Sequence, residues 1–269
     1  MTETEQDELA EVNAGRRRFL KIASAGLAAG ALGVLFSDKI LEVLGATPLD
    51  TRAVSGTDAQ WVMLIDLAKC DGCGQCTAGC RDAHFVPQGQ EWITVFKVQD
   101  ELGAEYFLPR PCMQCENPPC LKVCPVGATF RRDDGIVFID HDRCIGCRYC
   151  MAACPYSARS FNWGEPAHTP EEKAHTYSIE EPWPHRKGTV EKCMFCAHRA
   201  KEGKLPACVA ACTKEMGNGA IYFGDLREDA VSNGFETLPL AETLAKRGGF
   251  RFKAELGTKP RVWYLPARR

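Results

Sequence analysis

The sequence predicts an α+β fold made of two small modules in tandem, and three observations support this prediction. Sixteen cysteines fall into four blocks of four. Short runs of aromatic and β-branched residues, which are typical of strands, precede or follow the blocks. The order strand, cysteine loop, short helix and strand recurs around the second and third blocks. The blocks are Cys70, Cys73, Cys76 and Cys80; Cys112, Cys115, Cys120 and Cys124; Cys144, Cys147, Cys150 and Cys154; and Cys193, Cys196, Cys208 and Cys212.

The first and third blocks have the spacing C-x2-C-x2-C-x3-C, which binds iron–sulfur cubanes in bacterial ferredoxins. Three cysteines on a curled loop reach three irons of one cluster, while the fourth begins a helix and ligates the neighbouring cluster. Cys124-Pro125 and Cys154-Pro155 reproduce the Cys-Pro ending of the motif, whereas Cys80-Arg81 and Cys212-Thr213 depart from it. The sequence therefore predicts four [4Fe–4S] clusters in two ferredoxin-like dicluster modules, with short hairpins and helices around them. Blocks two and three form the inner module, and blocks one and four flank it as the outer module.

Three other interpretations of the cysteines remain open at this point. Structural zinc also uses four cysteines, but as two C-x-x-C pairs separated by a longer loop. Disulfides dominate small secreted proteins, and cysteines this close in sequence bridge poorly. A [3Fe–4S] cluster needs only three thiolates, but every block has four cysteines. Four cubanes are the interpretation that uses every cysteine.

The expected strands lie around the blocks. The run 130–139 predicts a hairpin with Asp134-Gly135 at its turn. We expect 162–192, which is rich in Pro, Glu and His, to form a loop outside the cluster-binding core. The other expected strands are 61–66, 95–98, 106–108, 221–224 and 262–265.

Three domains are expected: an export signal and linker (1–55), a four-cluster region (56–230) and a C-terminal extension (231–269). Arg16-Arg17, a spacer and Phe19-Leu20-Lys21 precede an apolar run at 22–36, and this order resembles a twin-arginine export signal. The apolar run is short for a membrane span. The twin-arginine translocase carries folded proteins, so the clusters would be inserted before export. The expected location is the periplasm or the outer face of the cytoplasmic membrane, with a retained N-terminal anchor as the alternative to cleavage.

Composition excludes several classes of function. The formal net charge is −2, with 33 Lys and Arg against 35 Asp and Glu, which argues against nucleic acid as a partner. No Ser/His/Asp set, phosphate-binding loop or dinucleotide fingerprint is recognisable in the sequence. We expect no catalytic residue and no substrate chemistry in this chain.

The block order resembles a known family. With C-x2-C-x4-C-x3-C as the second block and C-x2-C-x11-C-x3-C as the fourth, residues 61–226 are similar to the four-cluster iron–sulfur subunits of molybdopterin oxidoreductases. These include dimethyl sulfoxide, polysulfide, tetrathionate and formate-dependent nitrite reductase systems. The segments 144–156 and 192–196 extend the resemblance beyond the cysteines themselves.

The resemblance implies a ligand set for each cluster, and each set takes its fourth cysteine from the partner block. The first cluster would bind Cys70, Cys73, Cys76 and Cys212; the second Cys193, Cys196, Cys208 and Cys80; the third Cys112, Cys115, Cys120 and Cys154; and the fourth Cys144, Cys147, Cys150 and Cys124.

The resemblance also implies a function and partners. The chain would pass electrons between a molybdopterin-type catalytic subunit and a polysulfide-reductase-type integral membrane quinone subunit. A variant of this interpretation places it in a sulfite-reduction-associated transmembrane complex or beside a hydrogenase. A different class, a catalytic iron–sulfur enzyme, needs a cubane with an open iron, and the complete set of sixteen cysteines speaks against it.

Several residues beside the cysteines could tune the clusters. Cations close to ligands raise cluster potentials by stabilising the reduced, more negative form. The solvated alternative is open for each of them. We expect packing or surface roles for His84 and His198, and packing for Trp92 and Trp163. The cations are Lys69, Arg81, Arg148, Lys192 and Arg199.

Overall fold

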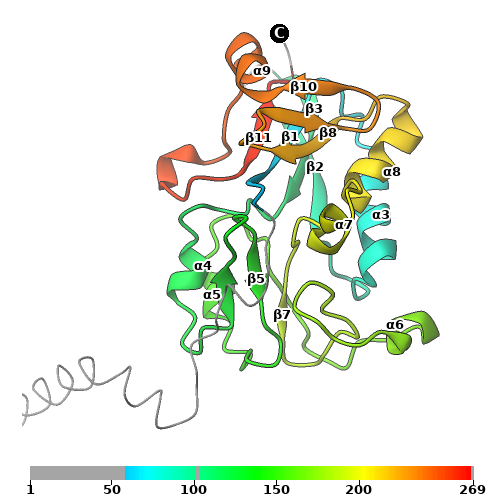
Figure 1. Cartoon of the computed structure of the whole chain (residues 1–269), viewed down its shortest axis with the longest axis vertical. Coiled ribbons are helices and arrows are strands. Elements are labelled where there is room, and N and C mark those ends of the chain that lie inside the picture. Colours follow the sequence, from blue (N-terminus) through cyan, green and yellow to red (C-terminus); the bar gives the residue numbers. More distant parts are fainter. Residues whose placement is uncertain (1–57, 101–102, 268–269) are drawn as a thin grey trace, which may run out of the picture. The chain divides into compact units, whose positions relative to one another are not determined.

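The computed structural model describes residues 58–100 and 103–267. Small sheets and short helices alternate along the chain, which confirms the predicted α+β class (Figure 1). The predicted export signal lies outside the described residues. In the part of the chain that the structure describes, no helix has the length and apolar character needed to span a membrane.

The largest sheet has five strands in the order β10-β9-β8-β1-β11. The strand before the first cysteine block, β1 (Trp61–Asp66), pairs antiparallel with β8 (Ile221–Asp225) and parallel with β11 (Val262–Leu265). Residues 62–65 of β1 are completely buried, as expected for a continuous apolar run in a strand with a neighbour on each side. The sheet continues through β9 (Ala230–Ser232) and β10 (Thr237–Pro239).

Two antiparallel helices form the core of the outer module. α3 (Gln75–His84) follows the first cysteine loop, and α8 (Ala207–Met216) carries the end of the fourth block. They lie side by side (Figure 1), and their contact is very close at Gly79. A Cβ atom at Gly79 would lie 2.5 Å from Cβ of Ala211, so only glycine fits there. The short helix α7 (Ala197–Lys201) lies between the cysteines of the fourth block.

The inner module consists of hairpins and one-turn helices. The predicted hairpin forms from β4 (Thr129–Arg131) and β5 (Val137–Ile139), with Gly135 at φ 85° in the turn. The two predicted strands between the first and second blocks pair as β2 and β3, and both are longer than expected. The helices α4 and α5 follow the second and third cysteine loops. The bounds of these four elements are β2 Ile93–Gln99, β3 Glu105–Pro111, α4 Pro119–Lys122 and α5 Tyr149–Ala152.

The expectation of a loop at 162–192 was right for most of the segment, which is irregular, but wrong in placing it outside the core. This segment contains α6 (Pro170–Ala174) and ends with β7 (Val190–Glu191), which pairs with β6 (Ser160–Phe161). Trp183 and His185 within it are 2% and 1% exposed. Its Pro, Glu and His content indicated a loop, but the polar groups find partners inside the protein. His185 Nδ1 lies 2.6 Å from Glu191 Oε1, and the His185 backbone N–H donates to Glu172 Oε1.

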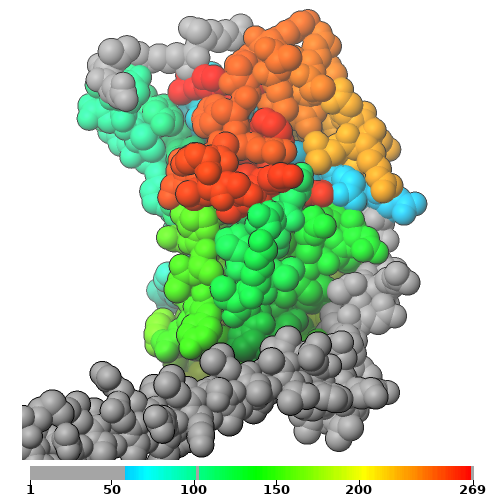
Figure 2. All heavy atoms as spheres, turned by 90° about the vertical axis from the view of Figure 1, so that its left-hand side faces the viewer, coloured from blue at the N-terminus to red at the C-terminus, as the bar shows by residue number. Residues whose placement is uncertain are grey.

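The C-terminal residues complete both modules. After α9 (Leu240–Arg247) and a 3-10 turn (Ala254–Leu256), β11 joins the central sheet beside β1. The backbone N–H groups of Glu116 and Asn117 donate to the carbonyls of Lys259 and Thr258. Figure 2 shows this segment, in orange and red, lying against the inner module, in green. The C-terminal residues therefore hold the inner module as well as the central sheet.

Candidate iron–sulfur centres

All sixteen cysteines lie among the described residues, and all are free thiols. The four blocks share one backbone feature: in each block, the second residue after the first cysteine has a positive φ. These residues are Gly72 (80°), Gln114 (44°), Gly146 (68°) and Phe195 (52°). A left-handed residue in a turn directs neighbouring N–H groups to one side and so makes an anion-binding concavity. The four loops are therefore shaped to surround an anionic cluster, although Gln114 and Phe195 are held in a conformation that costs about 1–2 kcal/mol.

The outer module brings the first and fourth blocks together through its two helices. Cys76 and Cys80 lie one turn apart on α3, as do Cys208 and Cys212 on α8. Because the helices are antiparallel, Cys76 lies near Cys212, and Cys80 lies near Cys208. Burial and the nearby negative charge of Cys212 raise the pKa of Cys76 to about 12. Burial and the charge of Cys196 and then Cys80 raise the pKa of Cys208 well above its usual value. Each helix therefore presents one cysteine to each of two sites.

The inner module repeats this exchange on a smaller scale. Burial and charge on Cys112 raise the pKa of Cys154, which places a third-block cysteine among second-block cysteines. Conversely, Cys124 of the second block lines one pocket with the first three cysteines of the third block. The structure therefore brings cysteines of partner blocks together in both modules, as the implied ligand sets require.

The two modules meet at Cys112 and Cys193. Burial and negative charge on Cys112 raise the pKa of Cys193 to about 12, so the third set adjoins the second. Within the inner module, Cys120 and Cys150 pack in one apolar cluster with Ile139, so the third set also adjoins the fourth. The four sets follow one another in the order first, second, third, fourth.

The surroundings of the sulfurs fit iron–sulfur clusters. Backbone N–H groups approach three of them: Phe195 N lies 3.4 Å from Cys193 Sγ, Ala207 N lies 3.4 Å from Cys196 Sγ, and Ala220 N lies 3.3 Å from Cys212 Sγ. Such N–H groups stabilise thiolate and sulfide charge. In residues 58–100 and 103–267, no three His, Cys, Asp or Glu side chains converge closely enough to hold a single metal ion.

His84 packs against other rings, as expected, and its side chain also contacts a cysteine sulfur. Its ring is 1% exposed and lies between Trp92, Trp183 and His198, as expected for a packing residue. Burial lowers its pKa to about 3, so the ring is neutral and carries one N–H. His84 Nε2 lies 3.0 Å from Cys196 Sγ. Sulfur is the acceptor when Cys196 is a thiolate, so His84 donates to a second-set ligand.

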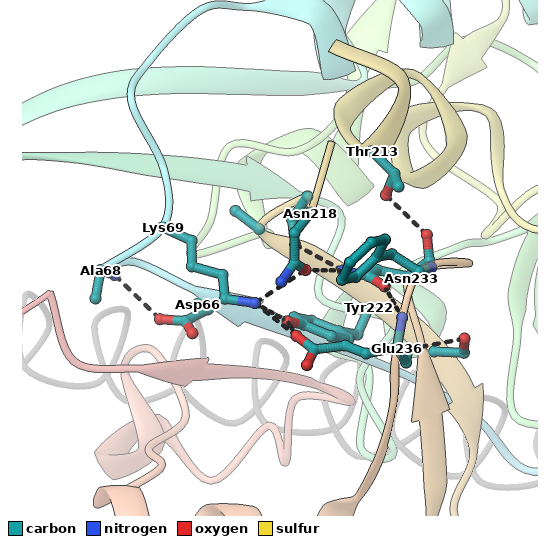
Figure 3. A network of polar contacts seen from close by, with 12 residues as sticks. Asp66, Ala68, Lys69, Thr213, Asn218, Tyr222, Asn233 and Glu236 are labelled. Atoms are coloured by element: carbon teal, nitrogen blue, oxygen red, sulfur yellow. Dashed lines mark hydrogen bonds and ion pairs between the residues drawn. The ribbon is translucent and has the colours of Figure 1, made fainter. Parts of the chain in front are cut away.

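The cations flagged in the sequence differ in their environments. Figure 3 shows the Lys69 ammonium bonded to Glu236, Tyr222 and Asn218, so its charge is already paired. Arg81 is half-exposed and 3.7 Å from Glu91. The charges of these two residues are therefore paired or exposed to solvent, and the other three cations have different environments.

Of these three, only Lys192 is deeply buried. Arg148 lies over the exposed ring of Trp163, with 4.4 Å between the guanidinium carbon and the ring centroid. Arg199 donates to the carbonyl of Leu205. The Lys192 ammonium donates to the carbonyls of Val137 and Cys193, and the side chain lies at the junction of the two modules.

Sequence analysis missed Arg159. This residue is 6% exposed and belongs to the short segment between Cys154-Pro155 and β6. The only signal in the sequence was a lone arginine close behind a cysteine block.

Comparison with known proteins agrees with the geometry. Residues 69–128 match a family model described as a 4Fe-4S dicluster domain, and residues 104–169 and 172–226 match a second model of the same description. The chain is 44% identical to a subunit of selenate reductase from Mesobacillus selenatarsenatis, over 77% of this chain and 72% of that protein. It is 41% identical to a subunit of tetrathionate reductase from Salmonella typhimurium, with the same coverage of 77% and 72%.

A third relative is the iron-sulfur cluster-binding subunit of menaquinone reductase from Nitratidesulfovibrio vulgaris, 39% identical over 78% of this chain and 89% of that protein. These matches confirm the predicted family, the tandem dicluster fold and the [4Fe–4S] cofactors. The chain belongs to the family of [4Fe–4S] dicluster subunits that transfer electrons within oxidoreductase complexes.

Proposed function

We propose that this chain conducts electrons through four clusters in the order first, second, third, fourth, and catalyses no substrate reaction of its own. The observation that carries this proposal is the proximity of cysteines from partner blocks. Cys76 lies near Cys212, Cys208 near Cys80, and Cys154 near Cys112, while Cys124 lines one pocket with Cys144, Cys147 and Cys150. With four thiolates in each set, every iron has a protein ligand, and none is open to a substrate.

The proposed ligands are the four sets given above, each with one cysteine from the partner block. A bound cubane supplies a one-electron redox change. The chain holds the thiolates, donates N–H groups to their sulfurs and excludes water, as the burial of Cys193, Cys196 and Cys208 illustrates. Close spacing of the four sets supports transfer between neighbours, because Cys112 adjoins Cys193 and Cys120 packs with Cys150.

The proposed partners are a molybdopterin-type catalytic subunit at one end of this series and an integral membrane quinone subunit of the polysulfide-reductase type at the other. The names of the relatives support both, since two belong to reductases of oxyanions and one to a menaquinone reductase. Both ends reach the surface of the described chain. Cys73 of the first set is exposed, and Ile145 and Tyr149 beside the fourth set are 63% and 64% exposed.

The proposed location is the periplasm or the outer face of the cytoplasmic membrane, after export by the twin-arginine translocase. Arg16-Arg17 and the apolar run behind them support it. Arg16→Lys with Arg17→Lys tests it, because the double variant should accumulate inside the cell with its clusters loaded. Export at the level of the unchanged protein would contradict the proposal.

Cysteine variants test the exchange of ligands between blocks. Cys124→Ser and Cys144→Ser should alter the same EPR signal, because both residues belong to the fourth set although they lie in different blocks. Cys112→Ser, in the same block as Cys124, should alter a different signal. If the variants group by block instead, the proposed ligand sets are wrong.

Two measurements on the unchanged protein test the function itself. Anaerobic purification should give about sixteen irons per chain, with only cubane signals in an EPR redox titration. A [3Fe–4S] signal in the oxidised protein, before any exposure to air, would show an incomplete set. The purified chain should reduce no selenate, tetrathionate or related oxyanion with an artificial donor. Turnover by the chain alone would refute the non-catalytic role.

A further inference from the structure

Arg159 is a buried cation that lies between two of the cysteine sets. Its exposed fraction is 6%, and its Nη1 donates to Thr129 Oγ1 at 3.3 Å. Its Nη2 has no hydrogen-bond partner among the described residues. Burying an arginine is costly unless negative charge and hydrogen-bond acceptors compensate it. The acceptors closest to this guanidinium are cysteine sulfurs, because the side chains of Cys120 and Cys150 both interact with Arg159.

The groups around Arg159 belong to the third and fourth sets. Thr129, its hydroxyl partner, lines the cavity that holds all four cysteines of the fourth set. Cys120 of the third set packs with Cys150 of the fourth in the apolar cluster that contains Ile139, and both cysteines interact electrostatically with Arg159. Arg159 thus occupies the junction where the two sets adjoin.

Negative charge on cysteine sulfurs compensates the positive charge of Arg159 at this junction. Burial alone would lower the pKa of Arg159, but negative charge on Cys120, Cys150 and Cys112 outweighs it and raises the pKa. In turn, burial raises the pKa of Cys150 and the Arg159 charge opposes that rise. An arginine stays charged at any pH at which a protein folds, so this charge is permanent.

We propose that Arg159 holds up the reduction potentials of both the third and the fourth cluster, and that its free N–H donates to sulfur at their junction. This inference rests on the proposed ligand sets. One electron, arriving from the neighbouring cluster, adds one negative charge to a cubane and its thiolates. A buried cation beside both clusters stabilises that added charge on each of them, and so raises both reduction potentials.

Arg81 provides a matched comparison. It follows the ligand Cys80 directly, but its side chain is 48% exposed and 3.7 Å from Glu91. Solvent and the carboxylate screen its charge. A buried arginine should therefore act on potentials far more strongly than an exposed arginine that is closer to a ligand in sequence.

The test is an EPR-monitored redox titration of the full chain in its complex. Arg159→Gln should make the third and fourth clusters about tenfold harder to reduce at a fixed ambient potential, which is a fall of about 59 mV for a one-electron couple. Arg159→Lys keeps the charge and should recover most of that loss. Arg81→Gln should leave all four potentials in place. Unchanged third and fourth potentials in Arg159→Gln with about sixteen irons bound would refute the proposal.

A labelled sample decides the matter if Arg159→Gln does not load its clusters. In the unchanged protein, arginine labelled with ¹⁵N in the guanidinium group alone should give a nitrogen hyperfine coupling to a reduced inner-module cluster in pulsed EPR, and Arg148→Gln should leave that coupling in place. The absence of that coupling in fully loaded protein would overturn the proposed donor. Iron content and the grouping of cysteine variants test the ligand sets separately, so failure of one idea is distinguishable from failure of the other.

Discussion

Replacement of Gly79 by alanine tests whether the contact between α3 and α8 holds the outer pair of clusters. The added Cβ would lie 2.5 Å from Cβ of Ala211 and 3.2 Å from the carbonyl oxygen of Ala207. Methyl groups in contact are about 3.5–4.0 Å apart, so the helices must separate by about 1 Å. Alanine in a helix gains about 1 kcal/mol over glycine, whereas overpacking costs about 1–3 kcal/mol. We expect a net loss of about 1 kcal/mol.

The assay is the rate at which iron–sulfur absorbance disappears on anaerobic heating. A loss of about 1 kcal/mol that acts on the barrier to cluster release corresponds to about a fivefold faster rate. Gly79→Leu should enlarge the effect and lower iron content from about sixteen to about eight, because the first and second sets lie on these helices. Gly164→Ala is the matched control, since a Cβ there meets no atom within 4 Å. An alanine variant as slow as the unchanged protein, or simultaneous loss of all four clusters, would refute the reasoning.

Three further predictions concern charge, sulfur and metal. The contact with Glu191 raises the pKa of the buried His185, although burial itself opposes that rise. The pair therefore stabilises the fold fully below the ordinary histidine pKa of 6.5 and loses this effect as the pH rises through the raised pKa. His185→Gln should flatten that part of a profile of stability against pH, and an unchanged slope would contradict the prediction. His84→Phe keeps the aromatic contacts but removes the N–H that donates to Cys196, so the second cluster should become severalfold harder to reduce. An unaltered reduction potential of that cluster would show that His84 only packs against the sulfur. Removal of iron by a chelator should abolish cooperative thermal unfolding, because metal binding is coupled to folding, and a cooperative melt of the apo form at the holo temperature would count against this.

The cysteine spacing predicted most of the site because cubane ligation imposes it. Three cysteines on one loop must be close in sequence, and the fourth must begin a helix, so the pattern is readable without coordinates. The strand at 61–66 and the turn at Asp134-Gly135 were likewise predicted, since a continuous apolar run and an Asp-Gly pair each have a local physical cause.

Other features depend on contacts between distant segments and could not be read locally. Glycine at position 79 resembles any helix glycine until Ala211, 132 positions later, is placed against it. The segment 162–192 has a loop composition, but its buried His185 and Glu191 satisfy each other. Arg159 becomes significant only when the third and fourth sets are placed on either side of it.

The nesting of the outer module around the inner one constrains when the protein can mature. Cys76 and Cys80 are made early, but α8, the helix that packs against theirs, carries Cys208 and Cys212 and is made much later (Figure 1). Likewise β1 cannot pair with β11 until that strand has been made. About 200 residues separate these strands, which at ~5–20 residues per second amounts to roughly 10–40 s of synthesis. All eight cysteines of the inner pair are made early in that time, whereas the outer pair lacks Cys208 and Cys212 until α8 is made. The backbone hydrogen bonds from Glu116 and Asn117 to the C-terminal segment form last. Maturation should therefore proceed from the inside outward, and a nascent chain stalled before residue 207 should hold about half of the final iron.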